Sequence, residues 1–281
     1  GFERKDSYPE YRTVVSTMAR VGRDEGCGRA MWEYEKELDR YGTPMALMLL
    51  PYWTDGCIGS MEGLFFESSA TTPYHFLNQS ELSRAPSCAQ RDLDYANCSG
   101  QNTPKVDEGV EHLKLMGVRY YMALSDEAKG QARTNPDLRL ITTTPAFNVR
   151  YTESGTTQVK ARSWDIFEVK GSELVEPLRF QPAVMTNVAK GGKPWLRAAQ
   201  AWYLDPARWD VPLAASGPPA WPRVRVGAGG GGPLAPGVVG TPVNPRGDVG
   251  LPNPPRRPVE PVIVSDIKTS DDRISFDVDR I

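Results

Sequence analysis

The segment at residues 50–78 combines the side chains of this chain that are best suited to hold a polar ligand. Aromatic rings, carboxylates, an imidazole and an amide follow one another there, with neither the helical nor the strand period. Flat rings can cover the C–H face of a sugar and carboxylates can accept its hydroxyl groups, so this composition predicts an aromatic-lined cleft for a sugar-like ligand. The candidate ligand-binding residues are Trp53, Asp55, Glu62, Tyr74, His75 and Asn78.

The same segment also fits a hydrophobic core. Aromatic side chains at the corner between a strand and a helix commonly pack in the interior, and the glycines and prolines would then mark turns. If the cleft forms, we expect the candidate residues to converge at the C-terminal end of an apolar strand at 46–50, because open α/β sheets place ligands there.

Catalytic residues stay unassigned. His75 has Ser68 and Glu67 nearby in sequence, but the chain has no Gly-x-Ser-x-Gly motif, so a hydrolase triad is not predicted. Asp55, Glu62 and Glu67 could supply the two carboxylates of a glycosidase, whose separation would set the stereochemical outcome. The alternative is that these carboxylates cap turns or pair with arginines.

The cysteines could be metal ligands, core thiols or two disulfides. The chain has no Cys-x-x-Cys pair, and its two histidines are not at ligand spacing, so we expect neither a metal nor another cofactor. Cys88 and Cys98 flank a short polar segment, and Cys27 and Cys57 adjoin the ends of strands predicted to be neighbours. We therefore predict the disulfides Cys88–Cys98 and Cys27–Cys57, and with them an oxidising, extracytoplasmic location.

Charge and hydropathy exclude two classes of partner. The 281 residues include 33 Lys and Arg against 35 Asp and Glu, without a basic run, so nucleic-acid binding is not expected. The longest apolar stretch, at 45–51, is far shorter than the roughly 18 residues of a membrane span. The chain opens on Gly without a signal peptide and stops within a predicted strand, from which we expect a piece of a longer protein.

The elements predicted around the segment indicate an α/β fold. Ser7 and Glu10 resemble a capping box, followed by a helix with apolar residues at helical spacing. Strands are predicted at 29–34, 46–50 and 118–124. A helix capped by Asp107 is predicted to run to about Met116, where Gly117 stops it, and a further helix is capped by Ser125. The last strands predicted in this part are 138–142, 158–162 and 164–169. We expect a mixed sheet flanked by helices, forming an α/β domain over 1–188.

The composition changes after this domain. A short helical connection is predicted over 189–216, with the helix itself at 195–209, and a Pro/Gly-rich linker over 217–261, where no packed element is expected. Residues 262–268 and 273–279 alternate as strands. Residues 262–281 are therefore predicted to begin a β-rich, sandwich-like domain.

Six short motifs give the chain a resemblance to a known group of proteins. They are Gly28-Arg-Ala-Met-Trp-Glu-Tyr34, Arg40-Tyr-Gly-Thr-Pro-Met-Ala-Leu47, Leu49-Leu-Pro-Tyr-Trp-Thr54, Gly59-Ser-Met-Glu-Gly-Leu-Phe-Phe-Glu-Ser68, Thr72-Pro-Tyr-His-Phe-Leu-Asn78 and Leu115-Met-Gly-Val-Arg-Tyr-Tyr121. Over residues 10–188 the chain resembles a soluble region of large actinobacterial polytopic membrane proteins, often labelled "6-pyruvoyl-tetrahydropterin synthase-related". Those proteins look like glycosyltransferases of the C superclass, which use lipid-linked sugars.

The resemblance implies an extracytoplasmic α/β domain that follows a bundle of transmembrane helices and precedes β-rich modules. It transfers no catalytic residue, because the catalytic carboxylate of that superclass lies between early transmembrane helices. It does not imply pterin chemistry either, since the synthase needs three zinc-binding histidines and this chain has two.

The leading hypothesis is a domain on the extracytoplasmic face of the cell membrane that binds or orients glycan for a glycosyltransferase-like protein of cell-envelope assembly. Its expected partners are a cell-envelope glycan or lipid-linked sugar and the protein's own transmembrane region. The parent protein would be the enzyme, and this part would not catalyse alone. The alternatives are a secreted carbohydrate-active hydrolase and a structural module that binds a protein partner without a small ligand.

Overall fold

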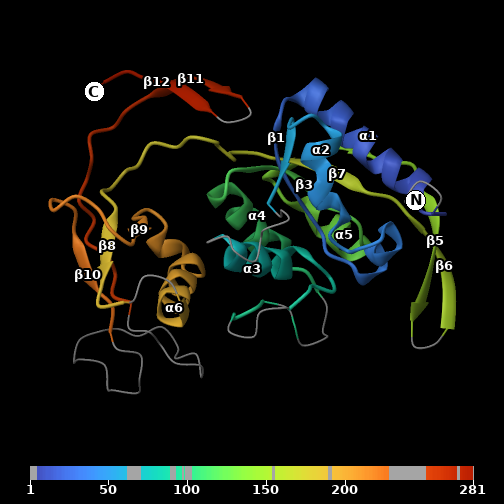
Figure 1. Cartoon of the computed structure of the whole chain (residues 1–281), viewed down its shortest axis with the longest axis horizontal. Coiled ribbons are helices and arrows are strands. Elements are labelled where there is room, and N and C mark those ends of the chain that lie inside the picture. The colour runs from blue at the N-terminus through green and yellow to red at the C-terminus, as the bar shows by residue number, and fades with distance from the viewer. Residues whose placement is uncertain are drawn as a thin grey trace. The chain divides into compact units, whose positions relative to one another are not determined.

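A computed structural model describes residues 5–61, 71–88, 93–96, 98, 103–153, 156–188, 192–227, 251–270 and 273–280. The chain forms two compact units, Gly1–Leu174 and Val175–Ile281 (Figure 1). The finer division predicted at residues 188, 216 and 261 stays a prediction. The fold class is confirmed, because the chain has a mixed sheet flanked by helices and further β-strands after it.

The first unit is built on a five-stranded sheet. Its strand order is β2 (Ile58–Ser60), β1 (Gly28–Trp32), β3 (Val118–Ala123), β7 (Asp165–Val169) and β4 (Leu138–Thr143). Strand β1 runs parallel to β2 and β3, whereas β7 is antiparallel to both β3 and β4. The central strands are apolar on both faces, as expected for a sheet covered on both sides.

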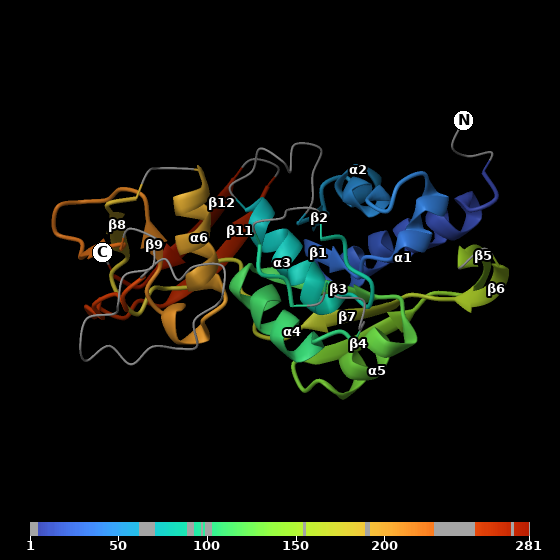
Figure 2. The ribbon, with the colours of Figure 1, turned by 90° about the horizontal axis from the view of Figure 1, so that it is seen from below.

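Helices cover both faces of this sheet (Figure 2). Along β1, Ala30 and Trp32 belong to one core cluster and Met31 to the other, because successive side chains of a strand point to opposite faces. The first cluster includes residues of α1 (Tyr8–Glu25), of the 3₁₀ helix Ala46–Leu49 and of α2 (Leu50–Trp53). The second cluster includes residues of α3 (Thr72–Leu82), α4 (Val106–Leu115) and α5 (Asp126–Thr134).

The prediction of a central strand at 46–50 is wrong. Residues 46–49 form a 3₁₀ helix and Leu50 begins α2, with Pro51 in the first turn, where the fixed φ of proline favours a helix start. A short apolar run has no period that separates a buried strand from a buried helix. The actual neighbour of β1 on this side is β2, which was not predicted.

The predicted capping box is also wrong in its contacts. Helix α1 begins at Tyr8 as expected, but the Ser7 hydroxyl donates to the carbonyl of Arg40 (2.5 Å) and makes no cap hydrogen bond. Glu10 accepts hydrogen bonds from the Arg40 guanidinium (2.6 Å) and from the Tyr41 hydroxyl (2.7 Å). Both side chains therefore tie the start of α1 to the 3₁₀ helix Lys36–Tyr41.

The other helices of the first unit show which helices could be predicted from capping residues and amphipathic period. Ser125 caps α5 as predicted, since its hydroxyl accepts from the amide of Ala128 (3.1 Å). Helix α4 spans Val106–Leu115, so its N-cap is Lys105 and not Asp107. Helix α3 was not predicted at all. It is buried nearly all round, and a helix without an exposed face has no amphipathic period to recognise.

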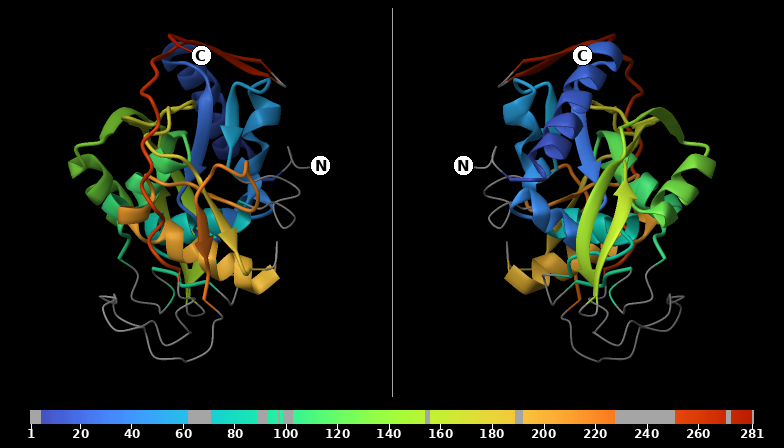
Figure 3. Two further views of the ribbon diagram at one scale, coloured as in Figure 1. Left: turned by 90° about the vertical axis from the view of Figure 1, so that its left-hand side faces the viewer. Right: turned by 90° about the vertical axis from the view of Figure 1, so that its right-hand side faces the viewer.

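A hairpin of β5 (Phe147–Glu153) and β6 (Thr156–Arg162) completes the first unit, and its strands lie side by side (Figure 3). Strand β6 was predicted from residue 158, and β5 was missed. Residues 154–155 lie outside the described part of the chain.

The second unit contains a small parallel sheet in the order β10 (Arg223–Arg225), β8 (Ala183–Thr186) and β9 (Leu213–Ala214). Helix α6 (Gly192–Tyr203) and a 3₁₀ turn at Pro206–Arg208 accompany this sheet. Buried Val224 and Val226 belong to its core, so the expectation of no packed element in 217–261 is wrong for this stretch. Residues 228–250 lie outside the described part. The two predicted C-terminal strands are present as the hairpin β11 (Val264–Thr269) and β12 (Ile274–Val278).

Candidate functional site

The structure does not bring the five described candidate residues together. Trp53 ends α2 and Asp55 lies in the turn after it, on the side of the sheet that α1 covers. His75 and Asn78 lie on α3, which packs against α4 on the other side. The predicted convergence on one concavity is therefore wrong, because the sheet separates the two groups. Glu62 lies outside the described residues.

The candidate residues on α3 face protein. Asn78 is fully buried, and its Nδ2 donates to the carbonyl of Gly109 on α4 (2.9 Å) and to Glu81 Oε2 (3.2 Å). The same Glu81 oxygen lies 2.8 Å from His112 Nδ1 on α4. His75 is 2% exposed and edge-on to the Phe76 ring. These polar groups join α3 to α4 or fill the interior, as the core interpretation of the segment predicts.

Tyr74 and Asp55 differ from those buried groups. Tyr74 is half-buried, and burial raises the pKa of its hydroxyl. Asp55 is exposed and has a positive φ of 50°, a conformation that Asp adopts more readily than most residues. Asp55 thus belongs to the tight turn between α2 and β2.

The first predicted disulfide, Cys27–Cys57, is confirmed, with Cα atoms 4.7 Å apart. Cys27 precedes β1 and Cys57 precedes β2, and these strands are parallel neighbours that pair Gly28 with Ile58. The prediction used the right principle with the wrong strand, since it took 46–50 as the neighbour. A parallel pair starts at the same edge of a sheet, which brings the two preceding residues together.

The second predicted disulfide, Cys88–Cys98, is also present, with Cα atoms 6.2 Å apart. It closes the short polar segment expected from the sequence. Two disulfides are typical of proteins that fold in an oxidising compartment. The chain therefore has the character of an extracellular or secreted domain.

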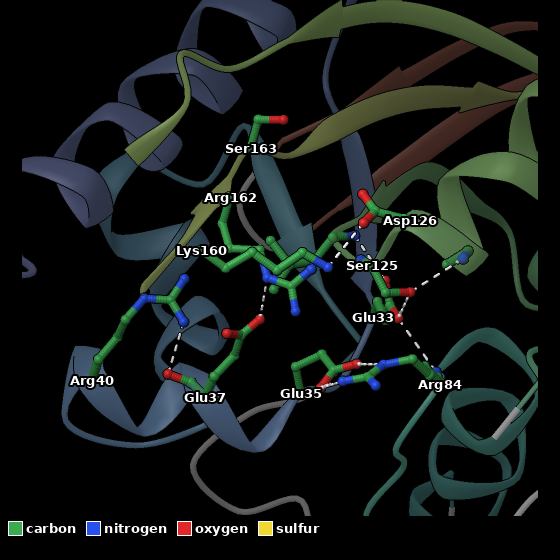
Figure 4. A network of polar contacts seen from close by, with 12 residues as sticks. Glu33, Glu35, Glu37, Arg40, Arg84, Ser125, Asp126, Lys160, Arg162 and Ser163 are labelled. Atoms are coloured by element: carbon green, nitrogen blue, oxygen red, sulfur yellow. Dashed lines mark hydrogen bonds and ion pairs between the residues drawn. The ribbon is translucent and has the colours of Figure 1, made fainter. Parts of the chain in front are cut away.

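The carboxyl edge of β1 and β3 holds a network of charged side chains that the sequence analysis missed (Figure 4). Glu33 follows β1, and its Oε2 accepts hydrogen bonds from the amides of Leu124 (2.7 Å) and Ser125 (2.8 Å) after β3. Its Oε1 accepts from the Ser125 hydroxyl (2.5 Å) and from the amide of Arg84 (3.3 Å). One carboxylate thus holds the ends of two strands, the start of α5 and the segment after α3.

Glu33 is inaccessible to solvent, and this burial raises its pKa to about 7 from an ordinary 4.5, against the opposing effect of its hydrogen-bond donors. The nearby charge of Glu35 raises it further. Perturbed carboxylates often mark active sites, but a strongly perturbed group can equally be structural. Its four described hydrogen bonds give Glu33 a structural role.

The remaining groups of this edge form ion pairs with one another. Arg84 Nε lies 3.0 Å from Glu35 Oε1, and Arg162 Nε lies 2.8 Å from Glu37 Oε1. Glu35, Glu37 and Arg162 are nearly buried. The alternation Glu33-x-Glu35-x-Glu37 directly after a strand was a sequence signal for this network. The place where an α/β sheet often binds a ligand carries ion pairs between the chain's own side chains here.

The exposed side of α1 carries a hollow, and Trp53 is the one candidate residue on its wall. This hollow, called the Trp53 hollow below, has a volume of about 340 Å³ and is lined by Tyr8, Tyr11, Arg12, Val15, Ser16, Ala19 and Trp53. The Trp53 side chain is 40% exposed. The Tyr52 ring stands edge-on to it at 5.1 Å, but does not line the hollow.

A hydrogen bond holds the Trp53 ring in place in the hollow, beside two exposed polar side chains. Tyr11 is buried, and its hydroxyl accepts a hydrogen bond from Trp53 Nε1 (2.9 Å). Burial raises the pKa of the Tyr11 hydroxyl, while the bond from Trp53 lowers it. Ser16 and Arg12 are exposed on the same face of α1. The hollow therefore offers a fixed aromatic ring beside a hydroxyl and a guanidinium.

The chain matches no protein-family model, no curated protein and no solved structure. Among the residues that the structure describes, no helix is long and apolar enough to cross a membrane. Within the same residues, no group of three or more His, Cys, Asp or Glu side chains is arranged to hold a metal ion.

Proposed function

We propose that the first unit binds glycan at the Trp53 hollow. The observation that carries this proposal is the half-exposed Trp53 ring, which a hydrogen bond to Tyr11 holds in place. An immobilised flat ring provides a surface for a sugar at little cost in side-chain entropy. The volume of about 340 Å³ lies at the lower end of the range for small-ligand sites.

Within a cell, the proposed role is that of an extracytoplasmic domain of a membrane-embedded, glycosyltransferase-like protein of envelope assembly. The two disulfides support the extracytoplasmic location, and the six sequence motifs support the kind of parent protein. In this role the domain binds or orients a cell-envelope glycan or lipid-linked sugar. Catalysis belongs to the parent protein, since the buried carboxylates of the sheet edge are engaged in ion pairs and hydrogen bonds.

The test is a titration of the folded protein with arabinan- and mannan-derived oligosaccharides. Trp53→Ala should weaken binding by roughly 1–3 kcal/mol, on the scale of aromatic stacking against a planar base. Tyr52→Ala is the matched control, because its ring is 74% exposed and lies outside the hollow, so this variant should keep the wild-type affinity.

Melting temperatures of all three proteins separate binding from folding. Trp53→Ala should remain folded, since much of its ring is in solvent. A wild-type protein that binds none of these oligosaccharides would overturn the proposal, as would equal affinities for wild type and Trp53→Ala. Secreted hydrolase activity would instead appear as release of free sugar during the same titration.

A further inference from the structure

A second hollow continues the Trp53 hollow along α1. It has a volume of about 450 Å³ and is lined by Pro9, Arg12, Thr13, Ser16, Thr17, Arg20 and Pro145. Arg12 and Ser16 line both hollows, so the two adjoin. We call the combined surface the α1 strip. Arg12, Ser16 and Arg20 are four residues apart in turn, which places them in one row on the helix surface.

The α1 strip is cationic. Six other arginines of the first unit form ion pairs, namely Arg40, Arg84, Arg119, Arg133, Arg139 and Arg162. Across the described ranges of the chain, no ion pair involves Arg12 or Arg20, and both are exposed. Among the described residues that line the two hollows there is no carboxylate. The whole chain has a net charge of −2, so this positive charge is local.

Two free guanidinium groups on one strip are suited to bind anionic groups. A guanidinium donates two parallel hydrogen bonds to a phosphate or carboxylate, a geometry that a neutral hydroxyl cannot match. Arg12 and Arg20 are eight residues apart, which corresponds to about 12 Å along a helix at 1.5 Å per residue. Between them lies Ser16, whose exposed hydroxyl can donate or accept.

The aromatic and cationic parts of the strip meet at Arg12. This side chain lines the Trp53 hollow on one side and the second hollow on the other. A ligand that stacks a sugar ring on Trp53 would therefore place its next groups beside Arg12 and then Arg20. A neutral glycan would leave both guanidinium groups without a partner.

We propose that the glycan bound by the α1 strip is anionic, with a sugar ring on Trp53 and phosphate or carboxylate groups at Arg12 and Arg20. This inference rests on the proposed function, because it names the substrate class of that same site. The shared chemistry is a negatively charged oxygen group attached to a sugar. Its source can be a phosphorylated sugar, a lipid-linked sugar phosphate or a uronic acid.

The experiment compares matched oligosaccharides. Wild-type protein is titrated with a neutral mannan oligosaccharide, the same oligosaccharide carrying phosphate, an oligosaccharide of uronic acid, a polyprenyl-phosphate sugar in detergent, and inorganic phosphate alone. At low salt at least one charged sugar should bind about tenfold more tightly than the neutral one, and added salt should reduce this preference because it screens exposed charges. The charged ligand that binds most tightly identifies the source.

Single and double variants test whether Arg12 and Arg20 cause the preference for charged sugars. Arg12→Gln and Arg20→Gln should each reduce the preference for the charged sugar, and the double variant should abolish it. Arg23→Gln is the matched control, because Arg23 is exposed on the same helix and lies outside both hollows. It removes the same charge and should leave all affinities unchanged.

The outcomes separate this inference from the proposed function. Equal binding of neutral and charged sugars, with loss in Trp53→Ala, would overturn the anionic class and keep glycan binding. An equal loss in Arg23→Gln and Arg12→Gln would also overturn it, since the effect would then be one of net charge. Binding of inorganic phosphate at Arg12 and Arg20 without any sugar binding would overturn the proposed function and this substrate class together, leaving only an anion site.

Discussion

Trp53 Nε1 donates a hydrogen bond of 2.9 Å to the hydroxyl of Tyr11, a residue 42 positions earlier in the chain. The Tyr11 hydroxyl in turn donates to the carbonyl of Ala46 (3.0 Å). The rings of Tyr11 and Trp53 meet edge-on, with their centroids 6.3 Å apart. A buried tyrosine on α1 thereby fixes a half-exposed tryptophan at the end of α2. The ring of the proposed glycan site is held in place before ligand arrives.

Tyr11→Phe tests this arrangement, because it keeps the buried ring and removes only the hydroxyl. We expect a loss of about 1 kcal/mol in the free energy of unfolding, since the Ala46 carbonyl loses its donor and Trp53 Nε1 its acceptor. Glycan affinity should fall, but by less than in Trp53→Ala, because the ring remains while its orientation loosens. Urea unfolding and oligosaccharide titration measure the two effects, with Tyr52→Phe as the control. Unchanged affinity in Tyr11→Phe would show that the hydrogen bond does not orient the site.

Glu33 should make stability depend on pH. Its pKa of about 7 in the folded protein exceeds the ordinary 4.5, so between these values the folded state retains a proton that the unfolded state has lost. The contribution of Glu33 to the free energy of unfolding is therefore fully present below about pH 4.5, falls as the pH rises towards 7, and is lost above pH 7. The total loss is on the order of 3 kcal/mol.

Glu33→Gln isolates that contribution, because an amide does not titrate in this range. The difference in unfolding free energy between pH 5 and pH 8 should be smaller in Glu33→Gln than in wild type. Glu127→Gln, on the exposed side of α5, should follow the wild-type curve. Parallel curves for wild type and Glu33→Gln would refute the raised pKa.

Two glycines in neighbouring helices should respond in opposite ways to alanine. A Cβ on Gly109 of α4 would lie 2.6 Å from Leu82 Cδ2 and 2.7 Å from its Cγ, and Leu82 is fully buried at the end of α3. Gly109→Ala should destabilise the fold by about 1–3 kcal/mol through this overpacking. A Cβ on Gly130 of α5 would meet nothing within 4 Å, so Gly130→Ala should stabilise by up to about 1 kcal/mol. Thermal melts of both variants decide the point, and a stable Gly109→Ala protein would mean that α3 and α4 are not in close contact.

The disulfide that closes the longer loop should contribute more to stability than the disulfide that closes the shorter loop. Cys27 and Cys57 are 30 positions apart, and Cys88 and Cys98 are 10 apart. Chain entropy predicts a loss of about 4 kcal/mol on replacing the first pair with serine and about 3 kcal/mol for the second. Denaturant unfolding of the two double variants compares them directly, and peptide mapping without reductant should recover both pairs from wild type. Four free thiols in that map would remove both the pairing and the argument for an oxidising compartment.

Local sequence was sufficient to predict an element that is amphipathic or that has a distinct end. Helix α1 followed from apolar residues at helical spacing, and the start of α5 from Ser125 as its cap. The disulfide Cys88–Cys98 followed from the short polar segment between its cysteines, and Cys27–Cys57 from their place at the ends of strands predicted to be neighbours. These features depend on neighbours in sequence or on simple chemistry, so one chain carries enough information for them.

Tertiary structure decided the elements that are buried on every side and the site itself. The run at 46–50 became helical because a short apolar run has no period that separates a helix from a strand, and α3 gave no signal because it is buried nearly all round. Strand β2 pairs with β1, whereas α3 lies on the other side of the sheet. The sheet therefore separates Trp53 from His75, although these residues are only 22 positions apart in sequence. Aromatic composition could thus identify Trp53 as a candidate, but only the fold could place it beside Tyr11 and Arg12 on α1.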